Sequence, residues 1–301
     1  MKDHSRFINS DVEAYVLTHN AFFHFREFAN SIAKTGISNN GKNKLFNEID
    51  KYIYGDDDKR FYRTLNVGKR LYRARTISQS DLDSCKGINI FEKDEKYTTF
   101  GFDEGNSREA PLGCSDAGRN NIKGVSYLYL ADKIQTACVE VKPYCGQLIS
   151  VAEFKCKKDL NIIDFSNNVD FDIEESREDN IALGTFFTIV MSRFFLPVAD
   201  ESEYLATQIL TDHIRKSGID GIAYKSFYDR KGTNFTIFNS SRNSIEFIGS
   251  KIVMHKSVSN SFLDFNNGEI LKTDSMSNGK YDMRSADDIC KRIRNNIDKD
   301  V

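Results

Sequence analysis

The apolar positions near the N-terminus repeat with the period of an amphipathic helix. Asp11 is a candidate N-cap, and the turn at residues 36–41 closes the segment. A second helix is expected over residues 42–53. We therefore predict a helical N-terminal module over residues 1–68. Its core-facing positions are Tyr15, Phe22, Phe25, Ala29 and Ile32.

From Arg70 onward the pattern changes to the two-residue alternation of β-strands. In the segment RLYRARTI, the side chains of Leu71, Arg73 and Arg75 share one face. Two arginines on one strand face form either a solvated edge or an anion site. Similar apolar runs predict further strands at residues 127–130, 147–165, 219–227, 233–239 and 244–254.

Helical patterns lie between these strands. The segment after residue 130 is helix-like and carries Glu140, and Gly218 is suited to follow the end of a later helix. This alternation predicts an α/β (α+β) domain over residues 69–250. A C-terminal extension over residues 251–301 follows, with a terminal helix. The other helices are expected at residues 181–195, 203–218 and 285–297.

Composition narrows the class of protein. The chain has 301 residues and a formal net charge of −2, which argues against a nucleic-acid binder that relies on a basic face. The N-terminus lacks the pattern of a secretory signal, and the most apolar helical stretch, residues 181–191, is too short to cross a bilayer. We therefore expect a cytoplasmic globular protein that binds neither nucleic acid nor membrane.

The sequence predicts no metal site. The six cysteines include no CxxC pair, so buried, reduced thiols are expected. His19 and His24 are five residues apart and do not share a helix face. Residues 36–43 imitate a phosphate loop but follow a helix and have Asn43 in place of Ser or Thr. No GxGxxG follows a strand, which disfavours a Rossmann hydride-transfer enzyme.

The stretch from residue 110 to 141 places charges where a simple fold would not need them. A Gly- and Asn-rich loop presents Arg119, a short strand follows, and Glu140 lies between two valines. Taken singly, each candidate has an ordinary interpretation. Arg73 would be an edge charge, Glu140 a snorkelling helix residue, Tyr129 a core aromatic residue and Ser226 a strand-end cap.

Their order along the chain resembles the RES domain family, which is named for an Arg, a Glu and a Ser. The resemblance covers roughly residues 70–249. It rests on LYRAR at 71–75, AGR at 117–119, YLYLAD and TACVEV between 127 and 141, EYLATQ at 203–208, and DGIAYKS at 220–226, followed by Gly232 and Asn234. The resemblance implies a mixed sheet similar to that of ADP-ribosyltransferases and an enzyme that degrades NAD+ by hydrolysis or phosphorolysis.

The same resemblance implies the roles of individual residues. Arg73, Glu140 and Ser226 match the three residues that give the family its name and are the candidate catalytic residues. The candidate substrate-binding residues are Arg119, Tyr129, Gln208 and Asn234. NAD+ would be the substrate, not a recycled cofactor, and inorganic phosphate a candidate co-substrate.

The chemistry of these residue types fits such a reaction. Nicotinamide leaves as a neutral molecule, so the difficult step is the oxocarbenium-like transition state, which the carboxylate of Glu140 would stabilise. Arg73 and Arg119 would hold the pyrophosphate or a phosphate nucleophile. Two alternatives stay open: a protein ADP-ribosyltransferase, and a non-catalytic NAD-binding regulator. Many relatives implied by the resemblance are toxins of toxin–antitoxin pairs, so an antitoxin or inhibitor is a candidate partner, and a homo-oligomer is compatible with the sequence.

Overall fold

The computed structural model describes residues 50, 61–84, 88–90, 100–166, 194, 204–256, 261–263 and 270–272. This part of the chain is a mixed α/β structure with more strand than helix. It divides into two compact units, each assembled from separate stretches of sequence. The helix expected to begin near Asp11 and the helix expected at residues 285–297 lie outside the described residues. So does the helix expected at 181–195, except for Phe194, which is helical. Of the helix expected at residues 42–53, only Asp50 is described, and it is helical.

Unit 1 comprises Met1–Lys69, Glu109–Leu130 and Cys156–Ser244. Its strands follow the order β1-β7-β8-β9-β5. Strands β7 and β8 are parallel, whereas β1 pairs with β7 and β9 pairs with β8 in the antiparallel direction. The sheet is therefore mixed, as the sequence predicts. The strands are β1 (Tyr62–Leu65), β5 (Leu128–Ala131, of which Ala131 belongs to unit 2), β7 (Leu160–Asp164), β8 (Gly221–Lys225) and β9 (Thr233–Ile237).

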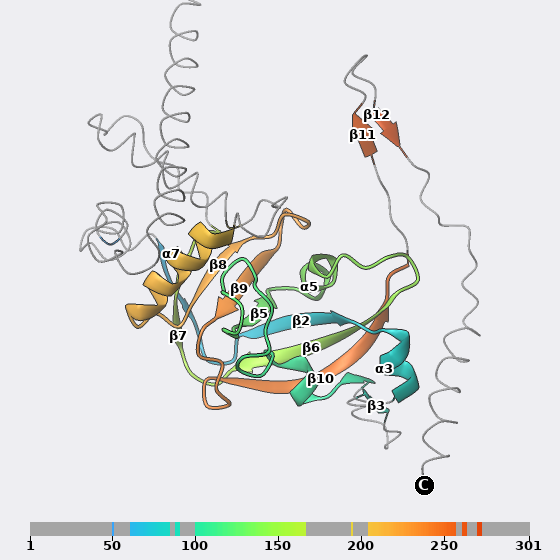
Figure 1. The fold of residues 1–301 in the computed structure, drawn as a ribbon, viewed down its shortest axis with the longest axis horizontal. Helices are drawn as coiled ribbons and strands as arrows, with labels where there is room; N and C mark the ends of the chain where they lie inside the picture. The colour runs from blue at the N-terminus through green and yellow to red at the C-terminus, as the bar shows by residue number, and fades with distance from the viewer. Residues whose placement is uncertain are drawn as a thin grey trace, which may run out of the picture. The chain divides into compact units, whose positions relative to one another are not determined.

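One helix, α7 (Leu205–Lys216), belongs to the described part of unit 1, and its apolar face is buried. Ile209, Leu210 and Ile214 face inward at the helical spacing read from the sequence. Strands β7, β8 and β9 are neighbours in the sheet, and Figure 1 shows α7 to the left of β8 and β9. Buried side chains such as Ile163 and Ile222, which oppose each other on β7 and β8, form the core beneath.

Unit 2 comprises Arg70–Arg108, Ala131–Lys155 and Ile245–Val301. Strand β2 pairs along its whole length with β6, so that Arg73 opposes Ala152 and Arg75 opposes Ser150. The order in this unit is β2-β6-β10. Its long strands are β2 (Arg70–Thr76), β6 (Leu148–Cys156, of which Cys156 belongs to unit 1) and β10 (Ile245–Met254). Two short strand pairs are β3 (Ile88–Ile90) with β4 (Phe100–Phe102) and β11 (Ser261–Leu263) with β12 (Ile270–Lys272). The helices are α3 (Gln79–Ser84), α4 (Glu104–Ser107) and α5 (Ile134–Glu140).

The strands expected between residues 70 and 254 are confirmed, and so is the helix that ends at Glu140. Two differences concern strands at the ends of the domain. β1 lies within the range that was expected to be helical. The sequence did not indicate this strand, because two of its four residues, Arg63 and Thr64, are exposed and give no apolar alternation. The β11–β12 hairpin lies in the polar extension, where three-residue strands are too short for a pattern.

The described residues include four of the six cysteines. Cys114, Cys138, Cys145 and Cys156 are free thiols, as expected, but only Cys156 is buried, so the expectation of burial was wrong for the others. No cluster of three or more His, Cys, Asp or Glu residues in this part is arranged to hold a metal ion. No helix in this part is long and apolar enough to cross a bilayer.

Candidate functional site

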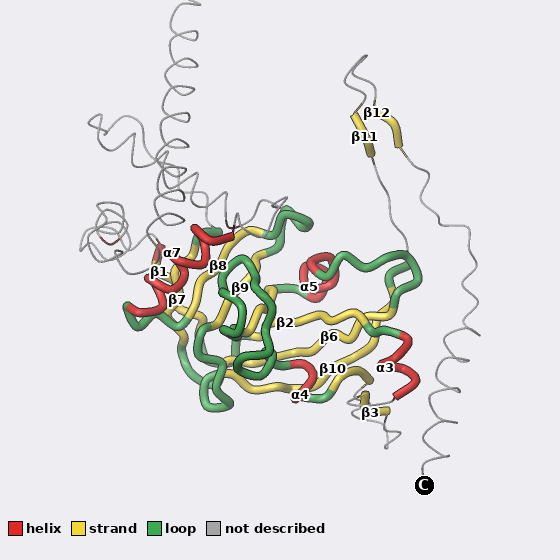
Figure 2. Tube along the Cα trace, in the orientation of Figure 1, coloured by secondary structure: helices red, strands yellow, loops and turns green. Residues whose placement is uncertain are grey.

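The loop that presents Arg119 is closed by its own backbone hydrogen bonds. The amide of Gly118 donates to the carbonyl of Asn121 at 2.9 Å, and that of Gly124 donates to Ser115 at 2.9 Å. Gly and Asn are frequent in such turns because they tolerate the backbone conformations that turns require. The long loop before β5 is green in Figure 2. Arg119 therefore sits on a folded loop in unit 1.

Tyr129 reaches this loop from the middle of β5. Its hydroxyl accepts a hydrogen bond from the amide of Asn120 at 3.2 Å and donates to Oδ1 of Asn121 at 2.6 Å. Burial raises the pKa of the Tyr129 hydroxyl above its ordinary value. The phenol is therefore neutral and serves as an internal hydrogen-bonding group of the loop.

Helix α7 holds the same loop from another direction. The amide of Gln208 donates to the carbonyl of Gly118 at 2.8 Å, and the hydroxyl of Thr207 donates to the carbonyl of Arg119 at 2.7 Å. The guanidinium of Arg119 lies over the ring of Tyr204, 5.3 Å from its centroid. The structure thus brings together three of the predicted substrate-binding residues, Arg119, Tyr129 and Gln208.

Asn120 connects the loop to β9. Its side-chain amide donates to Thr236 Oγ1 at 2.6 Å, while its buried Oδ1 has no hydrogen-bond partner. Thr236 and Asn234 are two residues apart on one strand, so both side chains point to the same face, about 7 Å apart along the strand. Asn234 is thereby placed on the strand face that meets the Arg119 loop.

Ser226 follows the last residue of β8 and is buried. Its hydroxyl accepts a hydrogen bond from the amide of Asp229 at 3.0 Å, and its own amide donates to Gly232 at 3.1 Å. Ser226 therefore closes the turn from β8 to β9, which is the strand-end cap considered as its ordinary role. A direct role toward a substrate stays a prediction.

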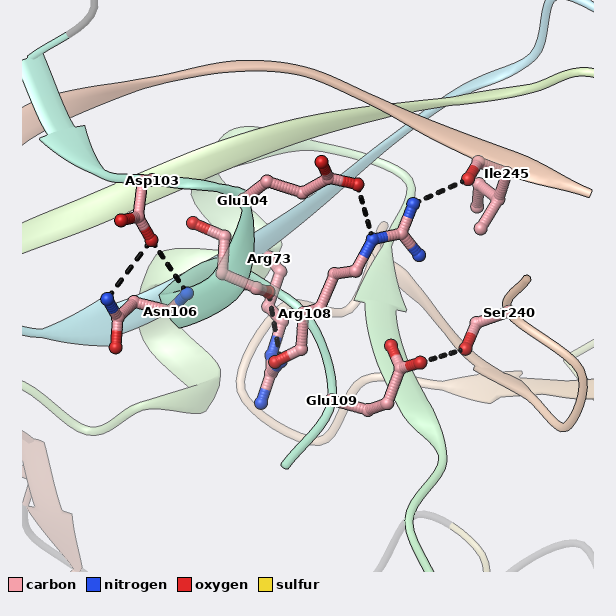
Figure 3. Close-up of polar contacts among 9 residues, drawn as sticks. Arg73, Asp103, Glu104, Asn106, Arg108, Glu109, Ser240 and Ile245 are labelled. Atoms are coloured by element: carbon pink, nitrogen blue, oxygen red, sulfur yellow. Dashed lines mark hydrogen bonds and ion pairs between the residues drawn. The ribbon is translucent and has the colours of Figure 1, made fainter. Parts of the chain in front are cut away.

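In unit 2, Arg73 lies beneath the short helix α4 (Figure 3). Its guanidinium donates to the carbonyl of Ser107 at 2.9 Å and also to the carbonyl of Arg108. Arg75, on the same strand face, donates to the carbonyl of Asn106 and lies over the ring of Phe102 at 4.8 Å. Both arginines thus bind the carbonyl end of one helical turn, where a positive charge is favourable.

The turn itself is fixed by its own side chains. Asp103 caps α4 by accepting from the amide of Asn106 at 2.9 Å. Arg108 donates to Glu104 at 2.7 Å and, on its other side, to the carbonyl of Ile245 on β10 at 2.8 Å (Figure 3). The carbonyls that receive Arg73 are therefore held in place.

Glu140 is the last residue of α5 and is partly buried. A carboxylate at the C-terminal end of a helix is disfavoured by the helix dipole, so helix stability does not explain this choice of residue. The helix packs on β2 through Ala137 and Ala74. Because neighbouring residues of a strand point to opposite faces, Arg73 points away from the face on which α5 packs.

Sequence reasoning missed four residues of the Arg119 loop environment. Asn120 and Asn121 directly follow Arg119, and Tyr204 and Thr207 lie inside the EYLATQ motif. A signal was therefore present, because each missed residue lies within four positions of a selected one. The sequence does not indicate that the AGR motif at 117–119 and the EYLATQ motif at 203–208 contact each other.

Comparisons with known proteins place the chain in a family. None of the curated proteins matches it. Among solved structures, it is similar to a chain in the crystal structure of the M. tuberculosis MbcT–MbcA toxin–antitoxin complex, with 14% identity and a TM-score of 0.36, over 64% of this chain and 87% of that chain. The RES domain model matches residues 92–251, a range that includes every predicted site residue except Arg73. Since this range is more than half of the 301 residues, the chain belongs to the RES domain family.

Proposed function

We propose that this RES domain degrades NAD+ by cleaving the bond between nicotinamide and ribose. The observation that carries the proposal is the setting of Arg119 within the family's matched range. Its backbone is hydrogen-bonded by α7 and its guanidinium lies on an aromatic ring. A guanidinium held in this way is suited to bind phosphate oxygens with little loss of side-chain freedom.

The reaction breaks the C1′–N bond of the nicotinamide riboside half of NAD+. The bonding electron pair leaves with the ring nitrogen, so nicotinamide departs neutral and positive charge develops on the ribose. Water then gives ADP-ribose and a proton, whereas phosphate gives ADP-ribose 1″-phosphate. The carboxylate of Glu140 is proposed to stabilise the developing cation, as carboxylates do in glycoside cleavage.

The remaining residues are proposed to bind or position the dinucleotide. Arg119 would hold the pyrophosphate, and Ser226 and Asn234 would contact the substrate from the β8–β9 turn and from β9. Arg73 is kept as a candidate catalytic residue on the family resemblance, although it lies before the matched range and binds the carbonyls of α4. The catalytic assignment of Arg73 is tested by its own pair of substitutions, Arg73→Lys and Arg73→Ala.

The test is incubation of the purified full-length protein with NAD+, with and without inorganic phosphate, followed by product analysis. Nicotinamide with ADP-ribose indicates hydrolysis, and nicotinamide with ADP-ribose 1″-phosphate indicates phosphorolysis. Label transferred from NAD+ to protein would support the ADP-ribosyltransferase alternative. Unchanged NAD+ in every condition, with wild type and Glu140→Gln behaving alike, would sink the catalytic proposal, and binding without turnover would favour the regulator.

We also propose that the activity is toxic when unrestrained and that an inhibitor protein accompanies it, as in a toxin–antitoxin or defence system. Depletion of NAD+ would stop growth of the cell that makes the enzyme. Induced expression of the wild type should therefore arrest growth and lower cellular NAD+, whereas Glu140→Gln should do neither. Equal growth of the two strains, at equal protein levels, would contradict a toxic role.

A further inference from the structure

We propose that the hydroxyl of Tyr129 and the side-chain amide of Asn121 are positioning groups that hold the loop presenting Arg119. This inference rests on the proposed function, because it concerns how that site presents Arg119. It goes beyond the expectation drawn from the family resemblance, in which Tyr129 lines the NAD pocket, because it gives the hydroxyl of Tyr129 a role inside the loop.

The hydrogen-bond capacity of Tyr129 is the first reason. A phenol has one proton to donate, and Tyr129 donates it to Oδ1 of Asn121 at 2.6 Å. The same oxygen accepts from the amide of Asn120 at 3.2 Å. A hydroxyl whose only proton points into the loop is not a donor for a ribose or phosphate. Both of these partners are buried residues that flank Arg119 on its C-terminal side.

Asn121 extends the contact across the loop. While its Oδ1 accepts from Tyr129, its Nδ2 donates to the carbonyls of Asp116 at 2.9 Å and Val125 at 2.8 Å. One side chain thereby joins β5 to both ends of the loop. Because residues 116 and 125 bracket Arg119, loss of this amide would release the segment that sets the position of the guanidinium.

The space around Gly118 supports the same arrangement. A Cβ atom at this position would lie 2.6 Å from Oδ1 of Asn121 and 3.1 Å from the hydroxyl of Tyr129. The loop backbone therefore lies directly against the Tyr129–Asn121 pair, without room for a methyl group at Gly118. On the other side, Gln208 binds the carbonyl of Gly118, so the residue is held from two directions.

A double-mutant cycle separates positioning from substrate contact. Tyr129→Phe removes only the hydroxyl and is expected to lower kcat/KM for NAD+ about 10-fold, mostly through KM, which matches loss of one hydrogen bond of about 1.4 kcal/mol. In an Arg119→Ala background the same change should have an effect of less than about 2-fold, because Tyr129 acts through Arg119. Additive effects would overturn the proposal.

Hydrogen exchange of the loop amides gives a readout that does not need catalysis. Tyr129→Phe and Asn121→Ala should speed exchange at residues 116–125, whereas Tyr144→Phe, which alters an exposed tyrosine, should leave it unchanged. Unchanged exchange in the first two variants would overturn the proposal even if the wild type proved inactive toward NAD+. An inactive wild type with altered exchange would overturn the proposed function but support the positioning role.

A matched pair of substitutions at Thr207 tests the same idea if the Tyr129 or Asn121 variants fold poorly. Thr207→Val keeps the shape but removes the hydroxyl that binds the carbonyl of Arg119, and Thr207→Ser restores it. We expect Val to raise KM and Ser to return it to within about 2-fold of wild type. Equal KM values for the two variants would contradict the view that backbone contacts set the position of Arg119.

Discussion

The guanidinium of Arg119 lies over the ring of Tyr204, with 5.3 Å between its central carbon and the ring centroid. Tyr204 immediately precedes α7, the helix whose Thr207 binds the carbonyl of the same arginine. One short segment therefore orients both the backbone and the charge of Arg119. Cation–π contacts of this kind contribute about 0.5–1 kcal/mol at accessible sites.

Tyr204→Leu is expected to weaken NAD+ binding by about 2–5-fold, because the ring that supports the cation is lost. Tyr204→Phe retains an aromatic face and should bind within about 2-fold of wild type. Isothermal titration with NAD+, using Glu140→Gln as the background to prevent turnover, measures both. Equal loss of binding in the two variants would show that the phenol oxygen, not the ring, is what Arg119 requires.

Glu140→Gln is expected to lower kcat for NAD+ cleavage by about 100-fold or more with little change in KM, because an amide cannot stabilise the developing cation. Steady-state assay of nicotinamide release is the measurement. The matched control is Glu153→Gln in the same unit, which removes only the partner of Arg70 near the surface and should leave kcat unchanged. Equal losses in the two variants would point to a general electrostatic effect and count against Glu140.

Gly101→Ala is expected to destabilise unit 2 by more than about 1 kcal/mol. Gly101 has a φ of +136°, and a Cβ would lie 2.6 Å from the hydroxyl of Ser150 and 2.7 Å from that of Ser250. Those hydroxyls bind the backbone of Phe102, at the N–H and carbonyl respectively. Denaturant unfolding gives the free energy directly.

The control for that substitution is Gly105→Ala. Gly105 lies inside α4, where the nearest atom to a new Cβ is Asp103 Oδ1 at 3.6 Å. Alanine favours helix over glycine by about 0.5–1 kcal/mol, so this variant should be as stable as wild type or more so. Similar destabilisation by both substitutions would contradict the steric account of Gly101.

Thiol labelling at neutral pH should modify Cys114 rapidly and leave Cys156 unmodified in the folded protein. Cys114 is exposed, whereas burial raises the pKa of the Cys156 thiol to about 11 and excludes the reagent. The thiolate is the reactive form, so reactivity at Cys156 should rise only in strongly alkaline solution or on unfolding. Peptide mapping by mass spectrometry after a short maleimide pulse assigns each site. Labelling of both residues at equal rates would show that Cys156 is accessible.

Most strand and helix positions between residues 70 and 254 followed from local pattern, but the short elements α3, β3, β4 and α4 were not predicted. The alternation in RLYRART predicted β2, in which Leu71 on one face and Ala74 on the other are buried, and the spacing in EYLATQILTDHIRK predicted α7. β1 and the β11–β12 hairpin were missed because strands of three or four residues contain too few positions to show a period.

For the candidate site, the sequence by itself determined which residues are candidates for the chemistry and in which order they occur, because residue type and motif spacing are local properties. Only the tertiary structure decided their contacts. Gln208 reaches the carbonyl of Gly118 across 90 residues of sequence, and Tyr129 directs its proton into the Arg119 loop. Likewise, alternation predicted that Arg73 and Arg75 share a face, but not that this face meets α4 while α5 packs on the other. The physical reason is that periodicity fixes the direction of a side chain within its own element, whereas the packing of distant elements decides what that side chain meets.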